Sequence, residues 1–219
     1  MNNLLYKNRI YGRTRGRSKN KINFEKYFEE VKNYNFIDIN HEEKNILDIG
    51  TGNGETSIYL ANKYKSSKIY TCDKYINGNI NLIKKIKAQK INNIFIHHGS
   101  VWEILQKLEK KKYFETVWVF FPDPWPKKKH NKRKLLNVNF FENIKHFLKP
   151  GGKIEITTDS IQYVQQILRC IYIIKDQYYW ENQFNFYLNY ADYQLPETKY
   201  YKKAIFTGNQ PFFFKLKKY

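Results

Sequence analysis

The chain has 219 residues, of which 42% are hydrophobic and 18% aromatic. This length and composition allow a buried core, which excludes wholesale disorder, and no apolar run is long enough to predict a membrane span. With 39 Lys and Arg against 20 Asp and Glu, the formal charge of +19 predicts a polyanionic partner.

The N-terminal stretch, residues 1–23, contains no acidic residue and carries Tyr11-Gly12-Arg13-Thr14-Arg15-Gly16-Arg17. Its glycines and the repulsion between its charges argue against a helix. We therefore predict an extended basic arm that binds phosphates, with a disordered tail as the alternative. Residues 24–219 are predicted to form a single domain, because neither a linker nor an internal repeat divides them.

A regular alternation of strands and helices follows a first predicted helix at 24–34. Predicted strands cover 46–49, 68–72, 94–97, 116–121 and 153–157, and predicted helices cover 55–64, 79–90, 101–111, 138–148 and 161–173. Five strand–helix units in succession predict an α/β fold, a mostly parallel twisted sheet with helices on both faces. Pro150-Gly151-Gly152 predicts a turn before the fifth strand. We then expect a short helix at 198–207, ended by Gly208, and a last, antiparallel strand at 212–216.

A glycine-rich loop, Asp48-Ile49-Gly50-Thr51-Gly52-Asn53-Gly54-Glu55, joins the first strand to the helix after it. Its spacing does not match the dinucleotide fingerprint, and an acid before the glycines suits a pyrophosphate poorly. A cationic or zwitterionic ligand such as S-adenosylmethionine fits Asp48 better. Asp73, at the end of the second strand, can hold a ribose diol. The alternative is a glycine-rich turn with two solvated aspartates.

The fourth strand ends in Phe120-Phe121-Pro122-Asp123-Pro124-Trp125-Pro126, which a basic run at 127–134 follows. Three prolines stop the strand, so Asp123 lies just past its carboxyl end, where open α/β sheets place their chemistry. Trp125 either stacks on a base or packs as a wall of the loop. The lysines and arginine of the run are predicted to track phosphates, with a solvated lysine run as the alternative.

Together these motifs resemble class I methyltransferases, and more specifically the bacterial tRNA (guanine-N7-)-methyltransferases. The most specific part is Phe121-Pro122-Asp123-Pro124-Trp125-Pro126-Lys127 with His130-Asn131-Lys132-Arg133. Tyr11-Gly12-Arg13, Pro150-Gly151-Gly152, Thr158-Asp159 and Pro196-Glu197-Thr198-Lys199 follow the family's order as well. The resemblance implies a Rossmann-like fold and methyl transfer from S-adenosylmethionine to N7 of a guanine in the variable loop of tRNA.

The resemblance also implies which residues form the site. Those implied to bind the cofactor are Asp48, Gly50, Gly52, Asp73, Ser100 and Asp123, and Asp123 is the implied catalytic residue. Those implied to hold the target guanosine are Lys127, Asp159, Thr198, Lys199, Tyr200 and Tyr201. Ser100 stands where the family usually has an acid, Tyr201 where it has a glutamate, and Ala204 where it has a glycine.

Two other functions remain open. A methyltransferase of exocyclic amines would carry an Asp/Asn-Pro-Pro-aromatic turn, and Asp123-Pro124-Trp125 lacks the second proline. A non-catalytic RNA-binding protein on the same scaffold is the other, supported by Ser100 and Tyr201. Cys72 and Cys170 are predicted to be reduced, buried thiols of a cytoplasmic protein. We expect no metal site and a monomer, with a dimer as the alternative.

Overall fold

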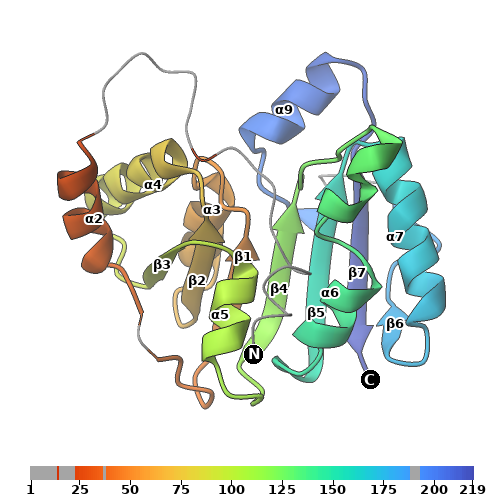
Figure 1. Cartoon of the computed structure of the whole chain (residues 1–219), viewed down its shortest axis with the longest axis horizontal. Coiled ribbons are helices and arrows are strands. Elements are labelled where there is room, and N and C mark those ends of the chain that lie inside the picture. Colours follow the sequence, from red (N-terminus) through yellow and green to blue (C-terminus); the bar gives the residue numbers. More distant parts are fainter. Residues whose placement is uncertain (1–13, 15–22, 37, 188–192) are drawn as a thin grey trace.

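The structure is a computed structural model that describes residues 14, 23–36, 38–187 and 193–219, and Figure 1 shows its α/β architecture. The strands of its sheet are β1 (Asn45–Ile49), β2 (Lys68–Asp73), β3 (Ile94–His98), β4 (Phe114–Phe120), β5 (Leu148–Thr158), β6 (Tyr178–Trp180) and β7 (Phe212–Lys218). Over the described residues they lie in the order β3-β2-β1-β4-β5-β7-β6. Strands β1 to β5 pair in parallel, whereas β7 is antiparallel to β5 and β6. The predicted fold class is therefore confirmed.

Helices cover both faces of this sheet, as predicted (Figure 1). Their bounds are α2 (Phe24–Lys32), α3 (Glu55–Lys63), α4 (Ile76–Gln89), α5 (Val101–Lys107), α6 (Val138–Ile144), α7 (Ile161–Ile173) and α9 (Lys199–Phe206), with a 3-10 helix η1 (Lys128–Arg133). Helices α2, α3 and α4 contribute to one hydrophobic core, and α5, α6 and α7 to another. The two cores are separated by the sheet, whose strand β1 is buried along its whole length. Such a strand needs apolar residues on both faces, and Ile46, Leu47 and Ile49 supply them.

The prediction of a turn at Pro150-Gly151-Gly152 before the fifth strand is wrong. These residues lie inside β5, which begins at Leu148. Phe114 pairs with Leu148 and Thr116 with Lys153, so the extra residues of β5 form a bulge opposite a short piece of β4. Gly151 supplies the positive φ of 67° that such a bulge favours. The predicted helix 138–148 consequently ends earlier, at Ile144, because Leu148 already belongs to the sheet.

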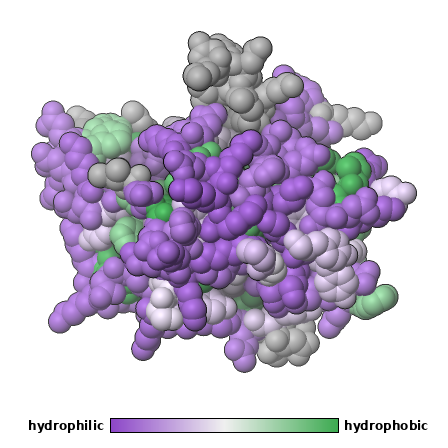
Figure 2. Space-filling model, turned by 90° about the horizontal axis from the view of Figure 1, so that it is seen from below, coloured by the Kyte–Doolittle hydropathy of each residue, from purple (hydrophilic) through white to green (hydrophobic). Residues whose placement is uncertain are grey.

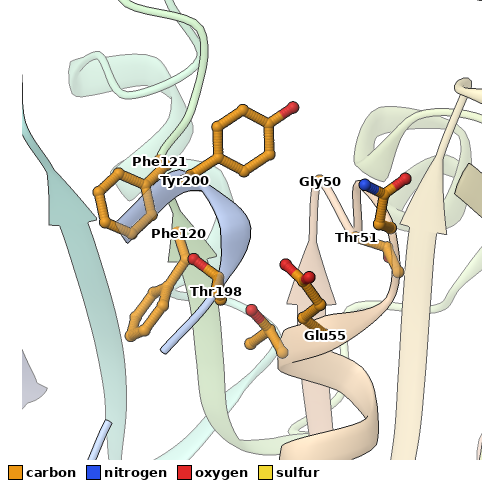
Figure 3. Close-up of a pocket in the computed structure, with 9 residues that line it drawn as sticks. Gly50, Thr51, Glu55, Phe120, Phe121, Thr198 and Tyr200 are labelled. Atoms are coloured by element: carbon orange, nitrogen blue, oxygen red, sulfur yellow. The ribbon is translucent and has the colours of Figure 1, made fainter. Parts of the chain in front are cut away.

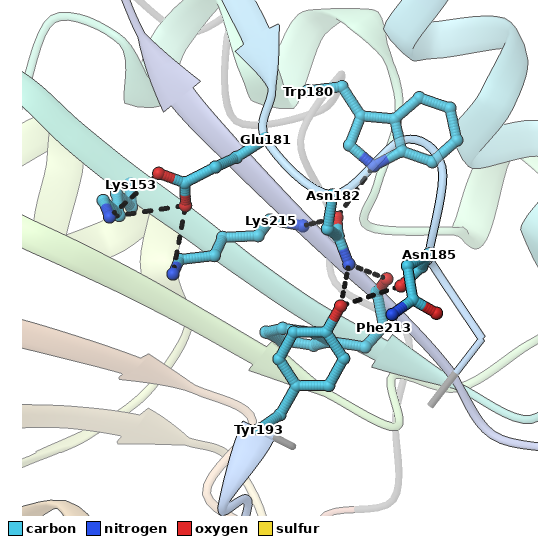
Figure 4. A network of polar contacts seen from close by, with 8 residues as sticks. All are labelled: Lys153, Trp180, Glu181, Asn182, Asn185, Tyr193, Phe213 and Lys215. Carbon is cyan, nitrogen blue, oxygen red and sulfur yellow. Dashed lines mark hydrogen bonds and ion pairs between the residues drawn. The ribbon is translucent and has the colours of Figure 1, made fainter. Parts of the chain in front are cut away.

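The residues that directly follow β6 are fixed to the edge of the sheet by a polar network around Asn182 (Figure 4). The Asn182 carboxamide donates to the Phe213 carbonyl (2.9 Å) and accepts from the Lys215 N–H (2.9 Å) and the Trp180 indole N–H (2.9 Å). Beyond the turn, the Tyr193 hydroxyl donates to the Asn185 carbonyl (2.8 Å). These bonds set the point from which the chain runs toward α9.

The face at the amino ends of the parallel strands is shown in Figure 2, where hydrophilic residues dominate and hydrophobic ones are scattered. Within the described part of the chain, no helix is long and apolar enough to cross a membrane. Cys72 and Cys170 are free and buried, as predicted. The opposite, carboxyl edge contains the point between β1 and β4 where the strand order reverses, and open α/β sheets bind ligands there.

Candidate functional site at the carboxyl edge of the sheet

A cleft opens at this reversal point, and three separate parts of the chain build it (Figure 3). They are the glycine loop with the first turn of α3, the end of β4, and the N-terminus of α9. The lining residues are Gly50, Thr51, Asn53, Glu55, Thr56, Phe120, Phe121, Thr198 and Tyr200. Its empty volume, including space open to solvent, is about 270 Å³. Of the predicted site residues, the cleft therefore brings together Gly50, Thr198 and Tyr200.

The glycine loop depends on backbone conformations that other residues rarely adopt. Gly52 has a φ of +54°, and a side chain there would meet the Tyr200 ring at 3.5 Å. Gly78 of α4 is a further requirement, since a Cβ at this position would lie 1.9 Å from the Gly52 carbonyl oxygen. The missing side chain of Gly78 therefore lets α4 approach the loop, which the sequence pattern does not predict.

Asp48 and Asp73 lie beneath and beside the loop. Asp48 is buried and accepts a hydrogen bond from the Ser57 hydroxyl (2.6 Å), and burial raises its pKa to about 7. Asp73 is half-buried and accepts from the Gly52 N–H (2.8 Å) and the Tyr75 N–H (2.9 Å). Burial raises the pKa of Asp73 also, against these backbone hydrogen bonds, which lower it. Because Asp48 is buried, the alternative of two solvated aspartates is wrong.

Thr51 adds an unsatisfied polar group to the same wall. Its hydroxyl is buried and has no hydrogen-bond partner within the described residues. A buried hydroxyl without a partner is costly unless a ligand or water satisfies it. The glycine backbone of the loop, two carboxylates next to it and this hydroxyl fit a ligand that carries both positive charge and hydroxyl groups. No group of His, Cys, Asp and Glu within the described ranges could hold a metal ion.

The end of β4 carries a strained backbone. Phe121 has a φ of 49° and Trp125 one of 42°, in the left-handed region that bulky residues rarely occupy. The Phe121 N–H donates to the Thr157 carbonyl (2.7 Å), which helps to hold this conformation. The Phe121 ring then stacks with Tyr200, their centroids 6.3 Å apart and their planes 21° apart. Strained residues of this kind cluster at functional sites, because the surrounding structure must hold them in place.

Asp123 is exposed and lies outside the lining of this cleft. Its negative charge nevertheless contributes to the raised pKa of Asp73, so the two carboxylates face the same end of the sheet. Trp125 packs against η1, with the Arg133 guanidinium 5.0 Å from its ring and the His130 ring edge-on at 5.5 Å. These contacts agree with the alternative in which Trp125 is a wall of the loop.

The basic run at 127–134 is not uniformly available to phosphates, which corrects the prediction for its last residue. Lys127, Lys129 and Lys132 are exposed. Lys134 is buried, lies 5.4 Å from the centroid of the Tyr163 ring, and has its pKa lowered by burial. A lysine in this position cannot contact a phosphate from outside without leaving its place in the fold.

Helix α9 begins where the sequence predicted. Thr198 is buried and caps the helix by accepting a hydrogen bond from the Tyr201 N–H (3.2 Å). Lys199 and Tyr200 are exposed, whereas Tyr201 is half-buried. Asp159, also half-buried, directly follows β5 at the same carboxyl edge.

Ser100, which the resemblance assigns to the cofactor, forms hydrogen bonds with Glu103 in this structure. It caps α5, accepting from the Glu103 N–H (3.3 Å) and donating its hydroxyl hydrogen to the Glu103 carboxylate (3.0 Å). The Glu103 carboxylate accepts from the Ser100 N–H in return (3.3 Å), which completes a capping box. Contact of Ser100 with the cofactor remains a prediction.

Sequence reasoning missed three lining residues that argue for the site: Thr51, Glu55 and Phe121. In the sequence, Glu55 stands out only as the residue that breaks the dinucleotide fingerprint. The available signal was its position, because the residue that opens the helix after a glycine loop faces the ligand side of the sheet. Phe121 resembles the last residue of a strand, although Pro122 restricts the backbone of the residue before it.

Comparison with known proteins places this geometry among methyltransferases. A family model described as "Putative methyltransferase" matches residues 42–213. A tRNA (guanine-N(7)-)-methyltransferase from Nitrosococcus oceani is 37% identical over 128 residues, which cover 58% of this chain but only 54% of that protein. One from Neorickettsia sennetsu is 32% identical over 162 residues, covering 73% of this chain and 72% of that protein.

The fold itself recurs in solved structures. The 16S rRNA methyltransferase KamB matches with a TM-score of 0.55 at 12% sequence identity, over 96% of this chain and 98% of that one. At this identity, the likeness concerns only the arrangement of strands and helices.

Proposed function

The chain belongs to the tRNA (guanine-N7-)-methyltransferase family, and we propose that it transfers a methyl group from S-adenosylmethionine to N7 of a guanine in the variable loop of tRNA. The observation that carries the proposal is the shared cleft. Its walls are the glycine loop that suits this cofactor and the Thr198 segment that the family resemblance assigns to the guanosine. A reaction between the two ligands requires that both binding segments line one cavity.

The residues present fit the cofactor. Asp48 would hold its ammonium group, Asp73 its ribose hydroxyls, and the backbone at Gly50 and Gly52 would pack against it without a Cβ in the way. When bound, S-adenosylmethionine supplies an electrophilic methyl group on a sulfonium sulfur. The buried, partnerless Thr51 hydroxyl offers one further hydrogen bond to the ligand.

Methyl transfer to guanine N7 does not require a general base. Guanine N7 carries an in-plane lone pair and no proton at neutral pH, so the protein must mainly align the reacting atoms. Positive charge develops on the purine as the bond forms. A fixed carboxylate can offset that charge or hold the guanine N1–H and amino group, and we assign this role to Asp123. Asp159 and the first turn of α9 would hold the nucleoside, and Lys127 a phosphate next to it.

The rest of the proposal concerns the setting of the enzyme. We propose that it acts as a monomer on tRNA in the cytoplasm, with the basic residues 1–23 as an additional phosphate-binding arm of a single domain at 24–219. That arm lies almost wholly outside the described residues. Of it, Thr14 is described, and its carbonyl accepts the Ile76 N–H at the start of α4 (3.1 Å). This bond places Thr14 at the helix that contacts the glycine loop through Gly78.

The test is nucleoside analysis of tRNA incubated with the protein and labelled S-adenosylmethionine. We expect 7-methylguanosine as the labelled product, and no label with a Gly52→Val variant, whose β-branched side chain would penalise the positive φ and collide with the ligand. A label on an exocyclic amine would instead indicate the other class of methyltransferase. Tight tRNA binding without any label would indicate a non-catalytic RNA-binding protein.

A further inference from the structure

Two helices that are 144 residues apart in sequence meet at one side chain in the cleft. Glu55, in the first turn of α3, accepts a hydrogen bond from the backbone N–H of Lys199 (2.7 Å). Lys199 is the first residue of α9, whose N–H has no acceptor within its own helix. Figure 3 shows the Glu55 side chain between the glycine loop and Thr198.

The bond belongs to the stronger kind. It joins a carboxylate to a backbone N–H at a helix N-terminus, where the helix dipole favours negative charge. It is also local to the cleft, because Glu55, Thr198 and Tyr200 all line it. Next along α9, the Tyr200 ring packs over Gly52 and stacks on Phe121. The first turn of α9 is thereby held on one side by α3 and on the other by the end of β4.

We propose that Glu55 is a positioning residue, which holds the first turn of α9 against the cofactor loop and so preorganises the segment that receives the target nucleoside. The inference deepens the proposed function and rests on it. When Glu55 is shortened, that turn is held in place only part of the time, and apparent affinity for tRNA falls in proportion to the time that it spends out of place. The cofactor's own contacts, at Asp48 and Asp73, are unchanged.

The hydrogen bond between Glu55 and Lys199 can be tested without an activity assay. Hydrogen exchange at the Lys199 amide, followed by NMR, should accelerate at least about tenfold in Glu55→Ala, the scale expected when a charge-assisted hydrogen bond is removed. The amide of Thr207, at the other end of α9, should keep its exchange rate because it bonds to the Lys203 carbonyl. Glu197→Ala is the matched control, since it removes an equal charge beside α9. Its carboxylate pairs with Lys202 (3.7 Å), and both side chains are about two-thirds exposed.

The second part of the test measures methylation kinetics with tRNA and equilibrium binding of S-adenosylmethionine. For Glu55→Ala we expect the KM for tRNA to rise about tenfold, with kcat within about threefold and cofactor Kd within about twofold of the wild type. In Glu55→Gln the KM for tRNA should stay close to the wild-type value, because the amide oxygen can still accept the hydrogen bond from the Lys199 N–H. Glu197→Ala should match the wild type.

The outcomes separate the two proposals. An unchanged Lys199 exchange rate, or a changed one with an unchanged tRNA KM, overturns the positioning role. Loss of cofactor affinity with an unchanged tRNA KM makes Glu55 a cofactor ligand and also overturns it. If the wild type forms no 7-methylguanosine, the proposed function fails, and the tRNA dissociation constants of the same variants then decide the role of Glu55.

Discussion

Asp48 is the buried carboxylate that we assign to the ammonium group of the cofactor. In the ligand-free protein, burial favours its neutral form and raises its pKa to about 7, whereas an ammonium group needs the ionised form. The Ser57 hydroxyl lowers that pKa and so keeps ionisation within reach near neutral pH. Burial of Asp48 therefore costs some stability in the ligand-free protein, but it provides a carboxylate that can ionise when a cation binds next to it.

The expected consequence is a pH-dependent cofactor affinity. Because the raised pKa leaves Asp48 mostly protonated at pH 6 and mostly ionised at pH 8, affinity for S-adenosylmethionine should rise with pH through about 7. The gain should be about tenfold between pH 6 and 8, since only the ionised fraction binds. Calorimetric titration of the wild type and of Asp48→Asn checks this. The variant should bind more weakly and show no such rise, and an equal rise in both would assign the titration to another group.

Asp123 should act on the methyl-transfer step and not on binding. Asp123→Ala should lower kcat for tRNA methylation by at least about 100-fold while leaving cofactor and tRNA affinity within about threefold, because the substitution removes an interaction made in the transition state. Single-turnover rates and equilibrium binding measure the two effects separately. Because Asp123 is exposed and lies outside the cleft, the variant should fold as the wild type does, and its melting temperature verifies this. Methylation at near the wild-type rate would remove Asp123 from the chemistry.

Among the elements, the glycine loop and the parallel strands could be predicted from local patterns, since buried strands and tight turns leave marks within a few residues. The Pro150-Gly151-Gly152 bulge could not be, because the same signal marks a turn between elements and an irregularity within one strand. Lys134 looks like its neighbours in sequence, and its burial depends on tertiary contacts such as that with the Tyr163 ring. The Glu55–Lys199 bond depends on tertiary folding, which no local pattern encodes.

The stability of helix α9 should depend on its N-terminal cap, Thr198. Thr198→Ala removes the cap that accepts the Tyr201 N–H, which costs about 1 kcal/mol. We expect the melting temperature to fall by about 2–4 °C, the usual change for that energy in a chain of this size. Thr198→Ser retains the hydroxyl and should restore most of the stability in calorimetry. If Thr198→Ser melts at as low a temperature as Thr198→Ala, the buried methyl group of Thr198 is what stabilises the helix.

At the scale of the whole molecule, the question is whether the charge of +19 acts through its total or through its placement. Exposed lysines occur on both edges of the sheet. Lys127, Lys129 and Lys132 lie on the loop after β4, at the carboxyl edge. Lys65, Lys110 and Lys175 are exposed in the connections that lead into β2, β4 and β6, at the amino edge. A tRNA whose guanine enters the cleft would contact the first set and not the second.

Two triple variants, with Gln at each set of three lysines, both lower the formal charge from +19 to +16 and so separate total charge from placement. Removing one lysine–phosphate interaction should reduce the slope of log affinity against log salt concentration by about 0.7–0.9. We therefore expect the slope of the carboxyl-edge variant to fall by about 2.1–2.7, with weaker tRNA binding at every salt concentration. The amino-edge variant should retain a slope near that of the wild type. Filter binding of tRNA over a range of salt concentrations measures both, and an equal decrease in the two variants would show that tRNA responds to the overall charge alone.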